Sequence, residues 1–432
     1  MKIAIKNIRI IDPANQLDQI TNLYLARGRI LTISPTDPEN FHPDQIIDGT
    51  DKWLIPGLID LQGRLGEPGN RYSGNIATET QAAAAGGITT LCCPPDTQPV
   101  ADTQAVIELI QRRARQAATA FVYPIGALTQ GLNGERLANI QALIQEGCIA
   151  VSQANQPIQN PLILRNALHY AASFNTLIII RSEDPQLKNN GIAHAGAISS
   201  RLGLEENPAS AETIALARDL ILIEESGVRA HISQISTARS VTMIAEAKKR
   251  GLPITCDVAA HQLHLTEYDT MDFNSLFHVT PPLRSKEDMQ ALRYGVQTGI
   301  IDAIVSDHTP LHPDAKLLPY PQSQPGISGF ETLLALILKL VDEQHLNLNQ
   351  AIATVTANPA KILQINRGSL NPGQPADFCI INPKAHWTLN RHKMNSAGNN
   401  TPFHGWEFNG LIEATYFQGR PVYRHPSQKT NG

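Results

Sequence analysis

The sequence predicts a (β/α)8 barrel of the TIM type, joined to a small β-sandwich domain that is built from both ends of the chain. In the middle of the chain, short apolar runs alternate with amphipathic helical stretches, a pattern typical of parallel strands linked by helices. Both ends are rich in short strand-like runs instead. The length of 432 residues, 42% of them hydrophobic, is sufficient for a large barrel with an appended domain.

The two ends of the chain are expected to fold together. Residues 1–53 contain short alternating strands separated by turns, and a second strand-rich segment begins near residue 370. Neither segment alone is large enough to close a hydrophobic core. We therefore expect one β-sandwich domain from residues 1–53 and 366–432, with the barrel occupying residues 54–365.

Eight apolar runs in the middle of the chain have strand character, and eight is the number that a closed barrel of this type requires. They end near Leu61, Cys92, Pro124, Ser152, Ile180, Ile232, Asp257 and Ser306. Amphipathic helical stretches follow them, the clearest at residues 78–85, 104–116, 209–225, 238–250 and 330–341. The loop at residues 313–327 is rich in Pro, Gln and Ser, so it is the best candidate for a mobile lid or an interaction loop.

The composition argues against several classes of partner. A net charge of −4 gives no large positive field, so we expect neither nucleic acid nor an anionic membrane as a partner. No apolar run reaches the roughly 20 residues needed to cross a bilayer, and the first residues alternate like a strand rather than like a signal peptide. The cysteines are odd in number and show no Cys-x-x-Cys spacing, which favours a reducing cytoplasm with buried thiols. They are Cys92, Cys93, Cys148, Cys256 and Cys379.

The most informative stretch is residues 55–69, where an apolar strand runs into a loop punctuated by proline and glycine. Its frame, Pro-Gly-Leu-Ile-Asp-Leu-x-x-x-Leu-x-Glu-Pro-Gly, resembles the first barrel strand of dihydroorotases, members of the cyclic amidohydrolase group that also includes hydantoinases and allantoinases. Further strings match that family in the same order, at residues 86–90, 131–135, 182–184, 200–204, 281–284, 306–310 and 400–406. The resemblance covers almost the whole chain and implies an amidohydrolase-type barrel.

Dihydroorotases hold a binuclear zinc centre that turns a bridging water into hydroxide. The resemblance implies six ligand places: two histidines on the first strand, a carboxylated lysine or aspartate after the fourth, one histidine each on the fifth and sixth, and an aspartate on the eighth. In that order, this chain has Gln62, Arg64, Gln153, Arg181, His231 and Asp307. Only the last two are retained, so the resemblance implies a degenerate site without metal.

The two arginines change the charge of this site. Arginine is positively charged at any physiological pH and has no lone pair to give to a metal. Arg64 and Arg181 therefore place about two positive charges where the family places zinc. Like charges about 4 Å apart cost on the order of 4 kcal/mol at an effective dielectric constant of about 20. We expect one or both arginines to pair with Asp307, with Glu183 as an additional partner, and we expect no zinc.

The places that hold the substrate in the family are altered as well. The arginine that grips the substrate carboxylate is replaced by Gly66, and the asparagine of a Pro-Asn-Thr turn is replaced by Asp96. A second asparagine is replaced by Thr280, and a histidine after the eighth strand by Leu311, with His312 one place later. Because Asp96 adds a negative charge, it would repel a carboxylate substrate.

The histidines leave two alternatives open. His231 and Asp307 form either a catalytic remnant or a structural pair. His261 and His264 either build a new mononuclear metal site with His231 or are packed side chains. A serine nucleophile is not supported, because the sequence has no Gly-x-Ser-x-Gly elbow.

From the resemblance we expect a catalytically inactive dihydroorotase-like protein of pyrimidine biosynthesis. Some bacteria carry such proteins as companions of aspartate transcarbamoylase, which implies its catalytic subunit as the partner, in hetero-oligomers as well as homo-oligomers. One alternative is an active zinc-dependent dihydroorotase, or a related cyclic amide hydrolase, with a rearranged site. Another is a ligand-sensing barrel that holds a small anion between Arg64 and Arg181.

Overall fold

The computed structural model describes residues 1–426 of the chain. Its central feature is a sheet of eight parallel strands in the order β15-β14-β13-β10-β9-β8-β7-β6. The predicted strand ends fall on these strands or one residue beyond them, so the (β/α)8 barrel is confirmed. The strands are β6 (Leu58–Asp60), β7 (Ile88–Cys93), β8 (Phe121–Ala127), β9 (Ala150–Ser152), β10 (Leu177–Ile180), β13 (Ala230–Ile232), β14 (Ile254–Ala259) and β15 (Ala303–Val305).

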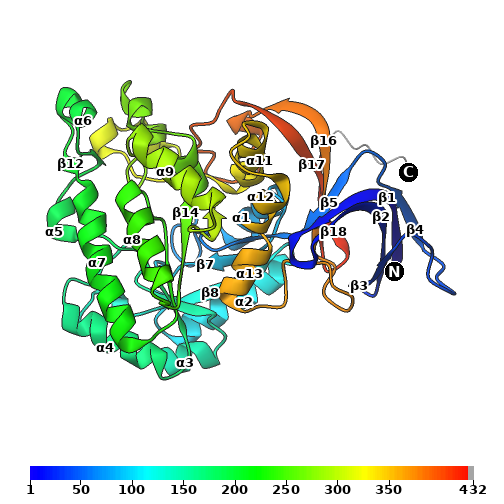
Figure 1. The fold of residues 1–432 in the computed structure, drawn as a ribbon, viewed down its shortest axis with the longest axis horizontal. Helices are drawn as coiled ribbons and strands as arrows, with labels where there is room; N and C mark the ends of the chain where they lie inside the picture. Colours follow the sequence, from blue (N-terminus) through cyan, green and yellow to red (C-terminus); the bar gives the residue numbers. More distant parts are fainter. Residues whose placement is uncertain (427–432) are drawn as a thin grey trace.

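Helices surround the barrel strands (Figure 1). Along β10, Ile178 and Ile180 pack outward against the helices, while Leu177 and Ile179 fill the interior of the barrel, as the two-residue period of a strand requires. The main helices are α1 (Ile76–Ala85), α2 (Gln104–Ala117), α3 (Ile140–Gln145), α4 (Pro161–Ala172), α7 (Ala209–Ser226), α8 (Ala238–Lys249), α9 (Lys286–Gln297), α11 (Leu333–Asp342), α12 (Leu348–Ala353) and α13 (Ala357–Leu363). The helical stretches predicted from periodicity coincide with five of these helices.

The barrel is closed at its seam by an inserted turn. Strands β6 and β15 form no continuous ladder with each other. Instead, the backbone N–H groups of Ile59 and Ile304 donate to carbonyl groups of segment 354–355, at 2.8 and 3.3 Å. Nearer the mouth, a single bridge joins Gly63 to His308. The turn between α12 and α13 thus satisfies backbone groups that would otherwise stay unpaired in the interior.

Strands from both termini meet in a second sheet, in the order β18-β17-β16-β5-β1-β2-β3, with β4 also paired to β1. The ends of the chain join where β16 runs antiparallel to β5, and in Figure 1 the late strands stand beside the early ones. The expected sandwich is therefore a single branched sheet, although its strands share one core. The strands are β1 (Lys2–Asp12), β2 (Leu17–Ala26), β3 (Arg29–Ser34), β4 (Gln45–Asp48), β5 (Trp53–Pro56), β16 (Phe378–Thr388), β17 (Glu407–Phe417) and β18 (Arg420–Arg424).

The loop at residues 313–327 is tied down along its length. The ammonium group of Lys316 is buried and donates to the carbonyl groups of Ser275 and His278, at 2.9 and 3.1 Å. Farther along, Ser323 bonds to the ring of His278 at 2.9 Å. The structure therefore packs this candidate lid against segment 275–278. Among residues 1–426, no helix combines the length and the apolar character that a bilayer crossing requires.

Candidate functional site

The carboxyl ends of the barrel strands form the mouth at which sites of this fold are built. Arg64 follows β6, Arg181 follows β10 and Asp307 follows β15, so three of the predicted positions lie at this mouth. Gln62, also after β6, is buried there. Gln153, after β9, is bound elsewhere: its side-chain nitrogen donates to Thr129 and to the carbonyl group of Leu132, each at 2.8 Å.

Arg64 links three strands of the barrel. Its Nε donates to Asp96 Oδ2 at 2.9 Å, in the loop after β7. Its Nη1 donates to Thr309 Oγ1 at 3.1 Å and lies 3.5 Å from Asp307 Oδ1. The expected contact between an arginine and Asp307 is therefore present. Asp96, expected to repel a substrate, is the closer partner of this guanidinium.

Arg181 pairs with Glu183 rather than with Asp307. Its Nη2 donates to Glu183 Oε1 at 3.2 Å and to Thr280 Oγ1 at 2.9 Å. Lys188 donates to the other oxygen of Glu183 at 2.9 Å. Burial alone would raise the pKa of Glu183, but the positive charges of Arg181 and Lys188 hold it below its usual range. Glu183 is thus a shared counter-ion for two cations.

Asp307 lies at the centre of this charge network. Burial raises the pKa of its carboxyl to about 6, although the charges of Arg64 and Arg181 act in the opposite direction. Gln234, just after β13, also faces Asp307 and helps to lower its pKa. Gln234 is buried, and its side-chain nitrogen has no partner at normal hydrogen-bond distance. Gln234 was not among the residues predicted from the sequence, although its place just after the sixth strand was the available signal.

His231 does not pair with Asp307, so the expected structural or catalytic pair is corrected. Its Nε2 lies 2.8 Å from Asp257 Oδ2 and its Nδ1 lies 2.8 Å from Thr255 Oγ1. The physical reason is register: His231 stands inside β13, directly opposite Thr255 on β14, and not at the end of the strand. Both ring nitrogens are occupied within the barrel wall.

His261 and His264 do not join His231 in a metal site. Burial lowers the pKa of His261 to about 3 and that of His264 to about 4, so both rings are neutral. The Nε2 of His264 lies 3.0 Å from the carbonyl oxygen of Leu336, to which it donates. Within residues 1–426, no three His, Cys, Asp or Glu side chains are arranged to hold a metal ion.

The donor set at the mouth does not fit the binuclear zinc centre that the resemblance implies. Zinc takes neutral imidazole, thiolate or carboxylate ligands. Here the mouth presents two guanidinium groups, from Arg64 and Arg181, and the carboxylate of Asp307 is already engaged by Arg64. The buried Nη2 of Arg64 and Nη1 of Arg181 lack hydrogen-bond partners. These nitrogens can donate hydrogen bonds, but they cannot bind a metal.

Gly66 stands where the family resemblance implies an arginine, but there is no room for a side chain at this position. Its φ is +67°, and an added Cβ would lie 2.4 Å from the carbonyl oxygen of Gly74. Gly66, Asp96 and Leu311 line a cavity of about 190 Å³ together with Arg64. Leu311 is buried there, and the cation that lines this cavity is Arg64, which is paired with Asp96.

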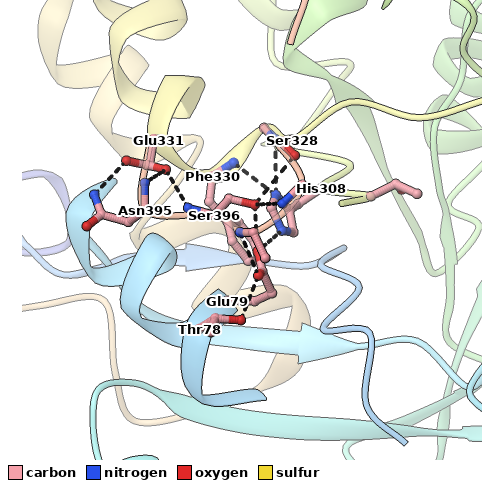
Figure 2. Close-up of polar contacts among 12 residues, drawn as sticks. Thr78, Glu79, His308, Ser328, Phe330, Glu331, Asn395 and Ser396 are labelled. Carbon is pink, nitrogen blue, oxygen red and sulfur yellow. Dashed lines mark hydrogen bonds and ion pairs between the residues drawn. The ribbon is translucent and has the colours of Figure 1, made fainter. Parts of the chain in front are cut away.

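His308, beside Asp307, belongs to a buried structural network (Figure 2). Its Nδ1 accepts from the backbone N–H of Gly329 at 3.1 Å, so the proton is on Nε2, which donates to Glu79 Oε2 at 2.9 Å. The ring also stacks on Phe330, with centroids 3.7 Å apart. Ser396 donates to the same carboxylate oxygen at 2.7 Å. Glu79 therefore ties α1, the end of β15 and the carboxyl-terminal segment together.

We predict that Arg64→Gln destabilises the protein more at high pH than at low pH. A folded pKa of about 6 lies above the unfolded value, so Asp307 lowers stability as its carboxyl ionises with rising pH, and Arg64 offsets this loss. The loss of unfolding free energy should be about 3 kcal/mol at pH 8 and clearly smaller at pH 5. Urea unfolding at both pH values measures it. Arg165→Gln, which removes an exposed pair with Glu225, is the control; equal losses at both pH values would refute the assignment.

We also predict that Gly66→Ala costs more stability than Gly203→Ala. Both glycines have positive φ, +67° and +64°, but an added Cβ at Gly203 has no atom within 4 Å. Gly203→Ala should therefore lose only the conformational term, about 1 kcal/mol, whereas Gly66→Ala should lose about 3 kcal/mol because of the added clash. Thermal and urea unfolding of the two variants would measure the difference, and similar losses would contradict the crowding at Gly66.

The family described as "Dihydro-orotase-like" matches residues 51–240, and the family described as "Amidohydrolase family" matches residues 335–423. A "Dihydroorotase-like protein" of Pseudomonas aeruginosa is 46% identical over 419 residues, covering 97% of this chain and 99% of its own. A "Dihydroorotase" of Syntrophus aciditrophicus is 41% identical over 424 residues, covering 98% of this chain and 100% of its own.

A solved structure agrees in fold. The L-hydantoinase (dihydropyrimidinase) from Arthrobacter aurescens superposes with a TM-score of 0.87 over 98% of this chain and 96% of its own, at 22% identity. At that identity the likeness establishes the fold alone, while the curated relatives establish the family. The chain therefore belongs to the dihydroorotase-like family of the amidohydrolase superfamily.

Proposed function

We propose that this chain is a catalytically inactive dihydroorotase-like protein of pyrimidine biosynthesis. The observation that carries the proposal is the ion-pair network at the mouth, where Arg64 engages Asp96 and Asp307. A divalent cation beside two guanidinium groups would be repelled in this buried setting. Without a metal, no group described at the mouth is placed to supply a hydroxide for hydrolysis of a cyclic amide.

The substrate side supports the same proposal. A carboxylate substrate needs a free cation, but the guanidinium of Arg64 is bound by Asp96, and Gly66 has no room for a side chain. Arg181 is bound by Glu183 and Thr280. Both guanidinium groups at the mouth are thus paired with carboxylates of this chain, although one nitrogen of each has no partner, and this pairing weakens their attraction for a substrate carboxylate.

We further propose that the barrel acts as an assembly subunit for the catalytic subunit of aspartate transcarbamoylase. A barrel that keeps its fold and loses its chemistry can still act through its surface and loops. The family resemblance supplies this partner, with hetero-oligomers and homo-oligomers as the assemblies. We also propose a cytoplasmic location, which the five buried, free cysteines support, since free thiols are typical of a reducing compartment.

The second candidate function is a working cyclic amide hydrolase with zinc. It is favoured by one observation: relatives that share about two fifths of their residues with this chain over nearly its full length bear the name "Dihydroorotase", such as the protein of Syntrophus aciditrophicus. In this case the metal would need ligands other than those at Gln62, Arg64, Gln153 and Arg181.

Zinc content and hydrolase activity separate the two candidates. We predict that the purified protein contains far less than one zinc ion per chain and does not hydrolyse dihydroorotate. The relative of Syntrophus aciditrophicus, purified in parallel, is the positive control, for which an active site of this type requires about one or two zinc ions. Elemental analysis and an assay of the same sample give the answer. Stoichiometric zinc together with turnover would reject the inactive protein in favour of the hydrolase.

Assembly is the test of the scaffold role. We predict that the protein and the aspartate transcarbamoylase catalytic subunit of the same organism elute together as one species, larger than either alone. Size-exclusion chromatography with light scattering gives the mass and the stoichiometry. The Arthrobacter aurescens hydantoinase, which shares the fold, serves as the control barrel and should elute separately. Separate elution of the two proteins at micromolar concentration would contradict the scaffold role.

A further inference from the structure

A groove in the described part of the chain shares no lining residue with the cavity beside Arg64. It has a volume of about 770 Å³, within the range of about 300 to 1,000 Å³ typical of binding clefts. Its walls come from α1, α11 and the three late strands of the terminal sheet. None of the six ligand positions and none of the four substrate positions lies in it. Whatever this groove binds is therefore separate from the degenerate site.

The groove exists because the β16–β17 arm lies along α11, as Figure 1 shows. Gly410 permits this close approach: its φ is +80°, and an added Cβ would lie 2.8 Å from Leu338 of α11. Trp387 is fixed in the wall, because its indole N–H donates to the carbonyl group of Gly410 at 3.0 Å. Met394 and Tyr423 add further apolar surface to the lining. Contacts within the chain therefore hold the groove in shape, and one of its walls is aromatic.

The charges of the groove are unbalanced. Lys393 and Arg424 line it, and within residues 1–426 neither forms an ion pair with a carboxylate, although Arg424 contacts the hydroxyl of Tyr416. The acidic residue in the lining is Glu331, whose carboxylate is already satisfied: it accepts from the backbone N–H and the side chain of Asn395, each at 2.8 Å, and from the backbone N–H of Ser396 at 3.1 Å. Figure 2 shows these bonds at the edge of the His308 network. The groove therefore offers two cations without a matching anion.

We propose that this groove binds an acidic, extended peptide segment of a partner protein. Its carboxylates would pair with Lys393 and Arg424, while its apolar side chains would pack against Trp387, Met394 and Tyr423. Charge complementarity selects this occupant, because Lys393 and Arg424 attract carboxylates and repel a basic segment. This inference rests on the proposed assembly role in one respect, namely that the segment belongs to an assembly partner. It adds the place on this chain where that partner would dock.

Binding of a model peptide tests the groove directly. The probe is a fluorescein-labelled peptide of alternating glutamate and leucine, and the matched probe carries glutamine in place of glutamate. Fluorescence anisotropy with the full-length protein should show binding of the glutamate peptide at least about tenfold tighter than of the glutamine peptide. Lys393→Glu and Arg424→Glu should each weaken the glutamate peptide about tenfold. Lys286→Glu, the same charge change at the exposed start of α9, should leave binding within about twofold.

The outcomes separate this inference from the assembly role. Equal binding of both peptides, or equal effects of Lys393→Glu, Arg424→Glu and Lys286→Glu, would overturn the groove as an acidic-segment site. If the glutamate peptide binds as expected but wild type does not associate with the transcarbamoylase, the assembly role fails and the groove stands. If wild type does associate, and the Lys393→Glu/Arg424→Glu double variant associates equally well, the groove is overturned as the docking site of that partner.

Discussion

The charge balance around Asp307 is the constraint on which the mouth of this barrel depends. A buried carboxylate is costly unless a cation or a metal stands beside it. In this chain the cation is the guanidinium of Arg64, 3.5 Å away and shared with Asp96. A guanidinium is permanently charged and offers no lone pair, so the group that stabilises Asp307 cannot itself serve as a metal ligand. Arg64 thus supplies the counter-charge that the buried carboxylate of Asp307 requires.

The same ion pairs also connect the ends of barrel strands to neighbouring loops. Arg64 connects the end of β6 to the loop after β7 and to the end of β15. Arg181 connects the end of β10 to Thr280 in the loop after β14. Charge-assisted hydrogen bonds with fixed geometry suit this task, since the planar guanidinium can bond to several loops at once.

The fold could be predicted closely from the sequence, whereas the site could be predicted only in part. Strand positions follow from local patterns: the apolar runs ending at Ile180 and Ile232 end in the structure at the same residues. The partner of a polar side chain is not a local property. His231 was expected beside Asp307 because both positions match the family, but β-sheet register places it opposite Thr255 and within reach of Asp257. The division of the chain at residues 53 and 366 stays a prediction.

The sequence by itself determined which chemical groups are available: two arginines, two glutamines, one histidine and one aspartate at the six places where the family resemblance implies metal ligands. Only the tertiary structure decided how these groups are used. It brought Asp96 to Arg64 across 32 residues and Glu79 to His308 across 229 residues, and it left Lys393 and Arg424 facing a groove. The physical reason is that side-chain identity is fixed by the chain alone, whereas hydrogen bonds, ion pairs and burial depend on contacts between segments far apart in sequence.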